Sequence, residues 1–504
     1  MRFRSLFITL GLLALLALPT RAQRPPNIVV FLVDDMGWQD TSVPFHTAIT
    51  ALNRKYHTPN MERLAARGMK FTQAYAATVC SPSRVSLMTG LNAARHRVTN
   101  WTLRKDTSTD GKHPTLTPPE WNVNGLSPVA GVPRTVHATP LPAILQSNGY
   151  HTIHVGKAHF GALGTPGENP LNLGFDVNVA GHAAGAPGSY LGQYNFSAAW
   201  RKGERVWDTP GLEKYHGQDI FLTEALTREA NAAVNQAIAQ KKPFYLYLSH
   251  YAVHTPIEKD DRYFAKYKAA GLTDVEAMFA ALVEGMDKSL GDVMDNLEKQ
   301  GVADNTIILF LADNGSLSAH GRGGELNTHN APLKSGKGSA YEGGTRIPMI
   351  VSWPQNTKAN SICTTPVIIE DVFPTVLEWA GVKNAKLVQQ PIDGQSFVPL
   401  LQGKAARKTD RAFVWHYPHI WGPTGPGIEL YSAIRVNDWK LIYFHAEGRR
   451  ELYNLAKDIG EQHDLAQQNP KMAARLSQHL RKYFVAVKAQ MPLEKSTNQL
   501  VPLP

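Results

Sequence analysis

Short, continuously apolar segments that end in polar residues recur along the chain and predict buried β-strands. The first is "NIVVFLV" at residues 27–33, which two aspartates follow directly. A run that is apolar at every position is typical of a strand buried on both faces in a parallel sheet. Further strands are expected in "HTIHVGK" (151–157), "KPFYLYLSH" (242–250) and "NTIILFLADNGS" (305–316).

Segments with helical signals alternate with these strands. Thr58, Pro59 and Gly68 predict the N-cap, the first turn and the end of one helix. Others are expected at 141–150 and from about Thr273 to Gln300. This alternation predicts an α/β sandwich with helices on both faces of a large, mostly parallel central sheet. In such sheets ligands bind outside the carboxyl ends of the strands.

The pattern changes near residue 402. Short antiparallel strands are expected in "AFVWHYPHIW", "YSAIRVNDWKLIYFH" and "RRELYNL", followed by a helix in "PKMAARLSQHLRKYFVAV". The sequence therefore predicts a large α/β unit at 23–401 and a smaller α+β subdomain with an antiparallel sheet at 402–504.

Residues 1–22 combine a basic start, an apolar run and a small residue before Gln23, which is typical of a cleaved secretory signal. The apolar run is shorter than the roughly 18 residues of a membrane-spanning helix. We therefore expect export to the periplasm or the medium, without stable membrane insertion. The net charge of +10 includes Arg2, Arg4 and Arg21 of this segment, which leaves +7 on the remainder. That excess suits an anionic substrate, but no dense basic tract indicates nucleic-acid binding.

Two predicted strands end in pairs of oxygen-bearing side chains. Asp34 and Asp35 follow the first strand, and Asp313 and Asn314 follow the strand that begins near residue 305. Three carboxylates and one amide oxygen at the same sheet edge suit Ca²⁺ or Mg²⁺. The alternative is that these residues only cap turns after their strands.

The stretch "TVCSPSRVSLMTG" places Cys80 at the start of a predicted helix that ends at Gly90. Pro82 suits the first turn, and Arg84 lies four residues after the cysteine on the same side of that turn. A helix N-terminus beside a guanidinium favours anions and is expected to lower the pKa of the thiol. Because the chain has two cysteines, a disulfide between Cys80 and Cys363 is the alternative.

The segments "CSPSR" and "LMTG" resemble the signature of the type I sulfatases, the arylsulfatase family of the alkaline-phosphatase-like superfamily. In that family the cysteine is oxidised after translation to formylglycine. The resemblance implies that Cys80 is the precursor of an aldehyde and that a formylglycine-generating maturation enzyme acts on this chain. It also implies an alkaline-phosphatase-like sandwich and leaves Cys363 as an unpaired thiol.

Five further segments resemble motifs of this family, in the family's order: "LVDDMG", "VGKAHFG", "YAVHTP", "LADNGS" and "GKGSAYEGGTRIP". By this resemblance the catalytic residues are Cys80, Arg84, Lys157, His159, His254 and Lys337. The metal, Ca²⁺ or alternatively Mg²⁺, is held by Asp34, Asp35, Cys80, Asp313 and Asn314. Ala158 departs from the family, in which an aromatic residue is common at this position.

The resemblance implies hydrolysis of a sulfate ester. The hydrated aldehyde attacks sulfur, Lys157 and Lys337 bind the sulfate oxygens, His254 protonates the leaving oxygen, and His159 helps to release sulfate. A sulfated carbohydrate is the expected substrate, because sugar faces stack on aromatic rings and hydroxyls need polar partners. "NAARHRVTNW" resembles bacterial sulfatases that act on galactose or N-acetylgalactosamine sulfates, and the candidates for the sugar subsite are His182, His416 and His419.

Two other functions are compatible with these residues. A phosphatase or phosphonate monoester hydrolase of the same superfamily shares the metal-binding edge. A non-catalytic, calcium-dependent glycan-binding protein would leave Cys80 unoxidised.

Overall fold

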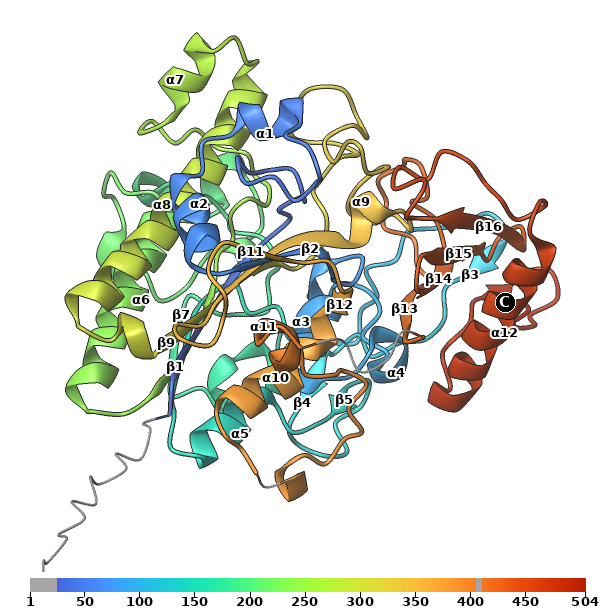
Figure 1. Cartoon of the computed structure of the whole chain (residues 1–504), viewed down its shortest axis with the longest axis horizontal. Helices are drawn as coiled ribbons and strands as arrows, with labels where there is room; N and C mark the ends of the chain where they lie inside the picture. The colour runs from blue at the N-terminus through green and yellow to red at the C-terminus, as the bar shows by residue number, and fades with distance from the viewer. Residues whose placement is uncertain (1–24, 384, 405–409) are drawn as a thin grey trace, which may run out of the picture.

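A nine-stranded sheet runs through the centre of the protein in a computed structural model of the chain (Figure 1). The structure describes residues 25–383, 385–404 and 410–504, so the predicted export signal at 1–22 lies outside it. From one edge to the other, the strands are Ser361–Cys363 (β11), Met69–Tyr75 (β2), Arg346–Ser352 (β10), Thr306–Ala312 (β9), Asn27–Val33 (β1), Phe244–Ser249 (β8), His151–Gly156 (β6) and Val177–Val179 (β7), with Val367–Ile368 (β12) beside β2.

The sheet is mostly parallel, which confirms the predicted fold class. Strand β1 is parallel to both β8 and β9, whereas β10 is antiparallel to β9 and β2. The register of β1 and β9 runs from Asn27 opposite Thr306 to Val33 opposite Ala312. The next residues, Asp34 and Asp313, therefore emerge side by side at the carboxyl edge.

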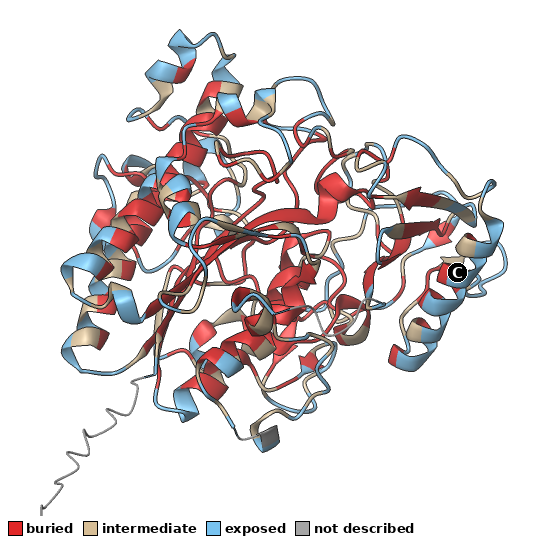
Figure 2. Cartoon of the chain, viewed as in Figure 1, coloured by how far each residue is buried: buried red, intermediate tan, exposed pale blue. Residues whose placement is uncertain are grey.

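Helices cover both faces of the sheet (Figure 1). On one face Pro59–Arg67 (α2), Leu222–Ala239 (α6) and Asp274–Lys299 (α8) pack together; on the other lie Cys80–Thr89 (α3), Leu141–Ser147 (α5) and Val372–Trp379 (α10). Every residue of β1, β8, β9 and β10 is buried between these layers, as Figure 2 shows. Shorter helices are Ala51–Lys55 (α1), Ala93–His96 (α4), Phe264–Ala269 (α7), Glu342–Thr345 (α9) and Val398–Leu401 (α11). None of the helices in the described ranges is long and apolar enough to cross a membrane.

Two predicted helix starts differ in how they are capped. Thr273 caps α8 as part of a capping box with Glu276. Helix α2 begins and ends as predicted, but the side chain of Thr58 makes no cap hydrogen bond. Its hydroxyl instead accepts from the backbone N–H of Ser42 at 2.9 Å, because this helix start packs against that loop.

The C-terminal part forms a second, antiparallel sheet. Its strands follow one another in space and in sequence, and Pro470–Val487 (α12) packs against the last three of them (Figure 1). They are Ala412–Tyr417 (β13), Tyr431–Val436 (β14), Trp439–Phe444 (β15) and Arg449–Asn454 (β16). Two small sheets lie elsewhere, Leu116–Thr117 (β3) with Leu493–Glu494 (β17), and Leu126–Ser127 (β4) with Val136–His137 (β5).

A buried cluster of charged side chains lies between the second sheet and the large α/β unit. Lys440 in β15 lies 2.9 Å from the carboxylate of Glu342 in α9 and 2.9 Å from that of Glu461. Glu461 also accepts from the backbone N–H of Glu342 at 2.6 Å. All three side chains are fully buried, and Glu342 also pairs with Arg346 at 2.7 Å, so Glu461 in particular depends on Lys440 for compensation.

Replacing Lys440 with alanine leaves two buried carboxylates close together without this cation. We expect Lys440→Ala to lower the free energy of unfolding by about 3–5 kcal/mol, as breaking a buried ion pair does. Urea unfolding measures the change. The control is Lys299→Ala at an exposed position of α8, which is expected to change stability by less than about 0.5 kcal/mol. A loss at Lys440 no larger than at Lys299 would contradict the structural role of the cluster.

Candidate active site

Three buried carboxylates and a cysteine converge at the carboxyl edge of the large sheet. One oxygen each from Asp34, Asp35 and Asp313, together with the Cys80 sulfur, all lie within 4.8 Å of one another. Asn314 joins the cluster by donating from Nδ2 to Asp35 Oδ1 at 2.8 Å. The structure thus brings together all five side chains that the sequence predicted as metal ligands.

The donors in this cluster fit a divalent cation. Asp35 Oδ2 and Asn314 Oδ1 are buried and have no hydrogen-bond partner, so both oxygens are free to bind an ion. Burial, followed by the nearby charge of Asp313, raises the pKa of Asp34 to about 8. A site rich in carboxylate and amide oxygens is typical of Ca²⁺ or Mg²⁺.

Each carboxylate of the cluster also pairs with a different buried cation. Asp34 accepts from Lys157 (2.6 Å), Asp35 from Lys337 (2.5 Å) and Asp313 from Arg84 Nε (2.9 Å). Burial alone would raise the pKa of Asp35, but Lys337, His254 and Lys157 hold it below its usual value. With all three carboxylates ionised, as they would be when they bind a metal, their charges are matched by these three cations.

The position of Lys157 depends on a glycine at the end of β6. Gly156 has φ +97°, and a Cβ there would lie 1.9 Å from the carbonyl oxygen of Ser249 in β8. This close approach lets the Lys157 N–H donate to the same carbonyl at 2.7 Å. The backbone is thereby fixed where the ammonium group reaches Asp34.

Cys80 is the first residue of α3, as predicted, and its sulfur lies 3.3 Å from Lys337 Nζ and 3.5 Å from Asp34 Oδ1. The expectation of a lowered thiol pKa is wrong. Burial raises the pKa of Cys80 to about 12, against the opposing effect of two lysines. Arg84, which pairs with Asp313, is not among the main groups that oppose this rise. Cys80 and Cys363 are both free, so the two cysteines form no disulfide.

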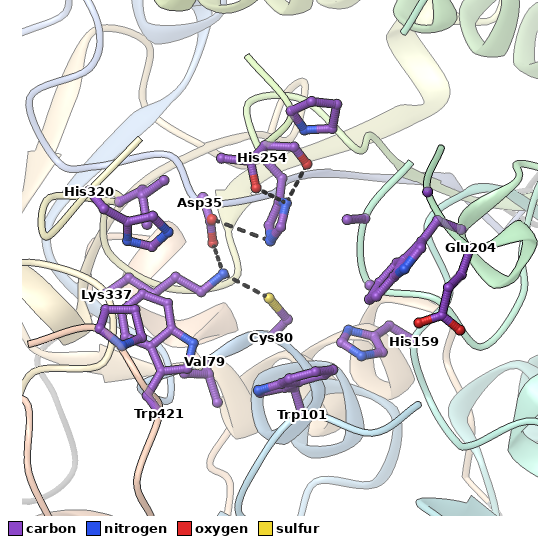
Figure 3. A pocket seen from close by; sticks show the side chains of 18 of the residues that line it. Asp35, Val79, Cys80, Trp101, His159, Glu204, His254, His320, Lys337 and Trp421 are labelled. Carbon is purple, nitrogen blue, oxygen red and sulfur yellow. Dashed lines mark hydrogen bonds and ion pairs between the residues drawn. The ribbon is translucent and has the colours of Figure 1, made fainter. Parts of the chain in front are cut away.

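Two histidines predicted from the sequence line the space above Cys80 (Figure 3). His254 donates from Nδ1 to the Thr255 carbonyl at 2.8 Å and keeps Nε2 3.6 Å from Asp35 Oδ2. Burial lowers the pKa of His254 to about 3, although Asp35 opposes the shift. His159 donates from Nε2 to the Thr102 carbonyl at 2.8 Å, which leaves its buried Nδ1 as an acceptor without a partner.

A cavity of about 650 Å³ opens onto this cluster. In Figure 3, Lys337 reaches between Asp35 and Cys80, with Trp101 and Trp421 near the sulfur. Several lining residues could not be predicted from the sequence, because a lone tryptophan or basic residue in a loop carries no local signal. They are Trp101, Arg201, Lys202, Trp207, His320 and Trp421.

The three histidines predicted for a sugar subsite do not line this cavity. His416 is buried, with Nδ1 bonded to Ser432 at 2.8 Å and Nε2 to the Gln490 carbonyl at 2.7 Å. His419 is likewise buried, between Thr99 and Asp110. Both rings use both nitrogens within the protein, which corrects the prediction that they contact substrate.

The remaining histidine, His182, supports the site from behind. Its carbonyl accepts from the His159 N–H at 3.2 Å, and its ring lies 6.5 Å from that of Tyr251. Its contribution is to the backbone position of His159 rather than to the cavity wall.

Comparisons with known proteins agree with this geometry. The family model described as "Sulfatase" matches residues 26–382, and one described as "N-sulphoglucosamine sulphohydrolase, C-terminal" matches residues 336–490. The chain is 28% identical to a protein named "Sulfatase" from Formosa agariphila over 96% of this chain and 93% of that protein. It is 32% identical to the N-acetylgalactosamine-6-sulfatase of Mus musculus over 80% of this chain and 71% of that one. The structure of Ps i-CgsB in complex with k-i-k-neocarrahexaose has a TM-score of 0.72 and 27% identity, and covers 91% of this chain and 93% of that chain.

The free oxygens of the cluster predict a stabilising response to divalent cations. After treatment with a chelator, adding Ca²⁺ or Mg²⁺ is expected to raise the unfolding temperature, since free cation at 100 times its Kd contributes about 2.7 kcal/mol. Asn314→Ala removes one donor oxygen without changing the charge, and should weaken the response in thermal unfolding. Asn172→Ala, at an exposed turn, is the matched control. An unfolding temperature that neither cation changes would contradict a metal site here.

Proposed function

We propose that this chain, which belongs to the sulfatase family and is a sulfuric ester hydrolase, cleaves sulfate esters of a carbohydrate with a nucleophile made from Cys80. One observation carries the proposal: the Cys80 sulfur lies at the base of the cavity, within reach of both Lys337 and the acidic cluster. The side chain from which the nucleophile would be made therefore faces both a substrate-sized space and the charges that an anionic ester needs.

Oxidation of the Cys80 side chain by a maturation enzyme would replace its thiol with an aldehyde. The hydrate of that aldehyde offers two hydroxyls on one carbon: one attacks sulfur, and loss of a proton from the other expels sulfate and restores the aldehyde. Arg84 holds Asp313 and orders the base of the site around this carbon. The buried acceptor Nδ1 of His159 suits removal of the second proton.

A divalent cation, for which we propose Ca²⁺, would be held by Asp34, Asp35, Asp313, Asn314 and the residue formed from Cys80. It would polarise a sulfate oxygen and make a bound hydroxyl more acidic.

Two lysines and a histidine are suited to the ester itself. Lys157 and Lys337 point their ammonium groups into the cluster, where the sulfate oxygens would lie between them and the metal. His254 presents Nε2 to the cavity, and we assign it as the acid that protonates the leaving oxygen. An anionic ester beside the ring favours its charged form and opposes the effect of burial.

The cavity wall supports a carbohydrate as the leaving group. Trp101, Trp207 and Trp421 each line the space. Indole rings bind the apolar faces of sugars and keep one polar N–H for a hydroxyl. By its printed name, the mouse relative acts on an N-acetylgalactosamine sulfate, and a galactose or N-acetylgalactosamine sulfate is the substrate class that we propose.

We also propose that the protein is exported to the periplasm or the medium and is matured by a formylglycine-generating enzyme. The segment at residues 1–22 has the composition of a cleaved signal. The substrate class, a sulfated glycan, fits an exported enzyme.

The rival phosphatase activity is distinguished by charge. An aryl sulfate carries one negative charge and an aryl phosphate carries two near neutral pH. Comparing kcat/KM for 4-nitrophenyl sulfate and 4-nitrophenyl phosphate on the matured protein tests the proposal. A higher value for the sulfate supports it, and a higher value for the phosphate would overturn it.

Modification of Cys80 is the first prediction. Peptide mass spectrometry of active protein is expected to show formylglycine at this position, and Cys80→Ala should lower kcat by about 10⁴–10⁶-fold, as loss of a nucleophile does. Cys363→Ala is the control, because that thiol lies in β11 and does not line the cavity. Active protein that contains only unmodified cysteine would refute this nucleophile. Protein that keeps Cys80 unmodified and releases no sulfate would instead favour the non-catalytic glycan-binding alternative.

The second prediction concerns His254. His254→Ala should reduce kcat/KM for a sugar sulfate by about 10²–10⁴-fold, because a sugar alkoxide needs a proton to leave. The loss for 4-nitrophenyl sulfate should be much smaller, since its phenolate leaves unaided. His320→Ala, at another histidine of the same cavity, is the control and should show no such difference between the substrates. Equal losses for both substrates would transfer the proton-donor role to another residue, with His159 next to be tested.

A further inference from the structure

The cavity continues past the metal cluster to a loop that no step of the reaction uses. This loop contributes Arg201, Lys202, Glu204 and Trp207 to the cavity wall. In Figure 3, Glu204 lies on the side of His159, away from His320 and Trp421. Resting on the proposed function, we propose that Lys202 anchors a second anion subsite, which binds a sulfate or carboxylate group on the sugar next to the one whose ester is cleaved.

The inner site already compensates the charge of the reacting sulfate. Its three carboxylates are matched by three buried cations, as described above. A divalent metal adds two positive charges, and the ester's sulfate carries only one negative charge. The reacting group is therefore already compensated, and a further cation at the outer end of the cavity serves a different anion.

Lys202 has no partner in the described part of the chain, whereas the charged residues around it are paired or hydrogen-bonded. Glu204 forms an ion pair with Arg104, and Arg205 lies 3.6 Å from Asp208. Arg201 donates from Nε to the Gly188 carbonyl at 3.2 Å, and its charge opposes the burial that raises the pKa of Glu258. Within the described ranges, Lys202 has neither an ion pair nor a side-chain hydrogen bond. Its exposed ammonium is thus available to a ligand.

Hydrogen bonds hold the backbone of this loop in place. The Thr209 N–H donates to the Phe196 carbonyl at 3.2 Å and closes its base. Asp208 accepts from Ser197 Oγ at 2.7 Å and from the Ala198 N–H at 2.9 Å inside it. Lys202 ends the turn Ala199–Arg201 (η4) at φ +55°, a left-handed conformation that is uncommon for a lysine. A fixed backbone keeps the Cα of Lys202 at the cavity wall, so that binding an anion has to order only the side chain.

A sugar can extend between the two ends. Trp101 lies beside Cys80 in Figure 3, and Trp207 belongs to the same loop as Lys202. The wall thus offers indole surface near both anion positions. This arrangement selects an anionic oligosaccharide over an isolated sulfated sugar.

Binding to an inactive protein tests the subsite without relying on turnover. Three disaccharides that share the same singly sulfated galactose are titrated into Cys80→Ser protein by calorimetry. The adjoining sugar is neutral in the first, carries a second sulfate in the second, and is a uronic acid in the third. At low ionic strength we expect one or both doubly anionic disaccharides to bind about 3–10-fold more tightly than the neutral one. The arm that shows the gain identifies the anion.

The variant Lys202→Gln should abolish this preference and leave the affinity for the singly sulfated disaccharide within about twofold. Lys241→Gln is the matched control. Lys241 is also exposed and left-handed, at φ +57°. It lies just before β8, at the amino end of that strand, whereas the cavity lies at the carboxyl ends. It should keep the preference.

The proposal is overturned if the parent protein does not prefer a doubly anionic disaccharide, or if Lys202→Gln keeps that preference. Hydrolysis of 4-nitrophenyl sulfate by matured protein separates this outcome from failure of the proposed function. Hydrolysis without charge preference removes only the subsite. Charge preference that depends on Lys202 in a protein without sulfatase activity keeps the subsite and removes the function.

Discussion

The arrangement of the site depends on three carboxylates buried within a few ångströms of one another. Asp34, Asp35 and Asp313 would repel one another strongly in this environment. Three separate cations and two oxygens left free for a metal make the arrangement tolerable. With the three carboxylates ionised, the cluster is balanced in charge, and a bound divalent ion gives it net positive charge. That gain is what attracts an anionic ester.

The sheet explains why the cluster forms where it does. Strands β1 and β9 are adjacent, parallel and in register, so the residues that follow them meet at one edge. This part of the site could be predicted from the sequence, because an apolar strand and the acidic pair after it are local features. The helix at Cys80 was also predictable, from Pro82 and Gly90. Strand β10 was not foreseen, although it is fully buried, because Arg346 and Pro348 interrupt its apolar pattern.

Other properties of the site depend on contacts between distant segments and carry no local signal. The thiol pKa of Cys80 is raised rather than lowered, because burial outweighs the effect of the nearby lysines Lys157 and Lys337. His416 and His419 looked like substrate ligands in a loop rich in aromatic residues, but tertiary contacts occupy both rings. The cavity wall itself combines Trp101, the loop around Lys202 and Trp421 of the C-terminal subdomain. Only the folded chain brings these segments together.

The central claim is that one metal ion binds between the two strand ends and beside Cys80. The most direct measurement is anomalous diffraction from crystals of the protein grown with calcium. The account predicts a single strong peak coordinated by Asp34, Asp35, Asp313, Asn314 and the residue formed from Cys80, at oxygen distances of about 2.3–2.6 Å. A map without a peak at this position, in which water binds the free oxygens of Asp35 and Asn314, would contradict the account.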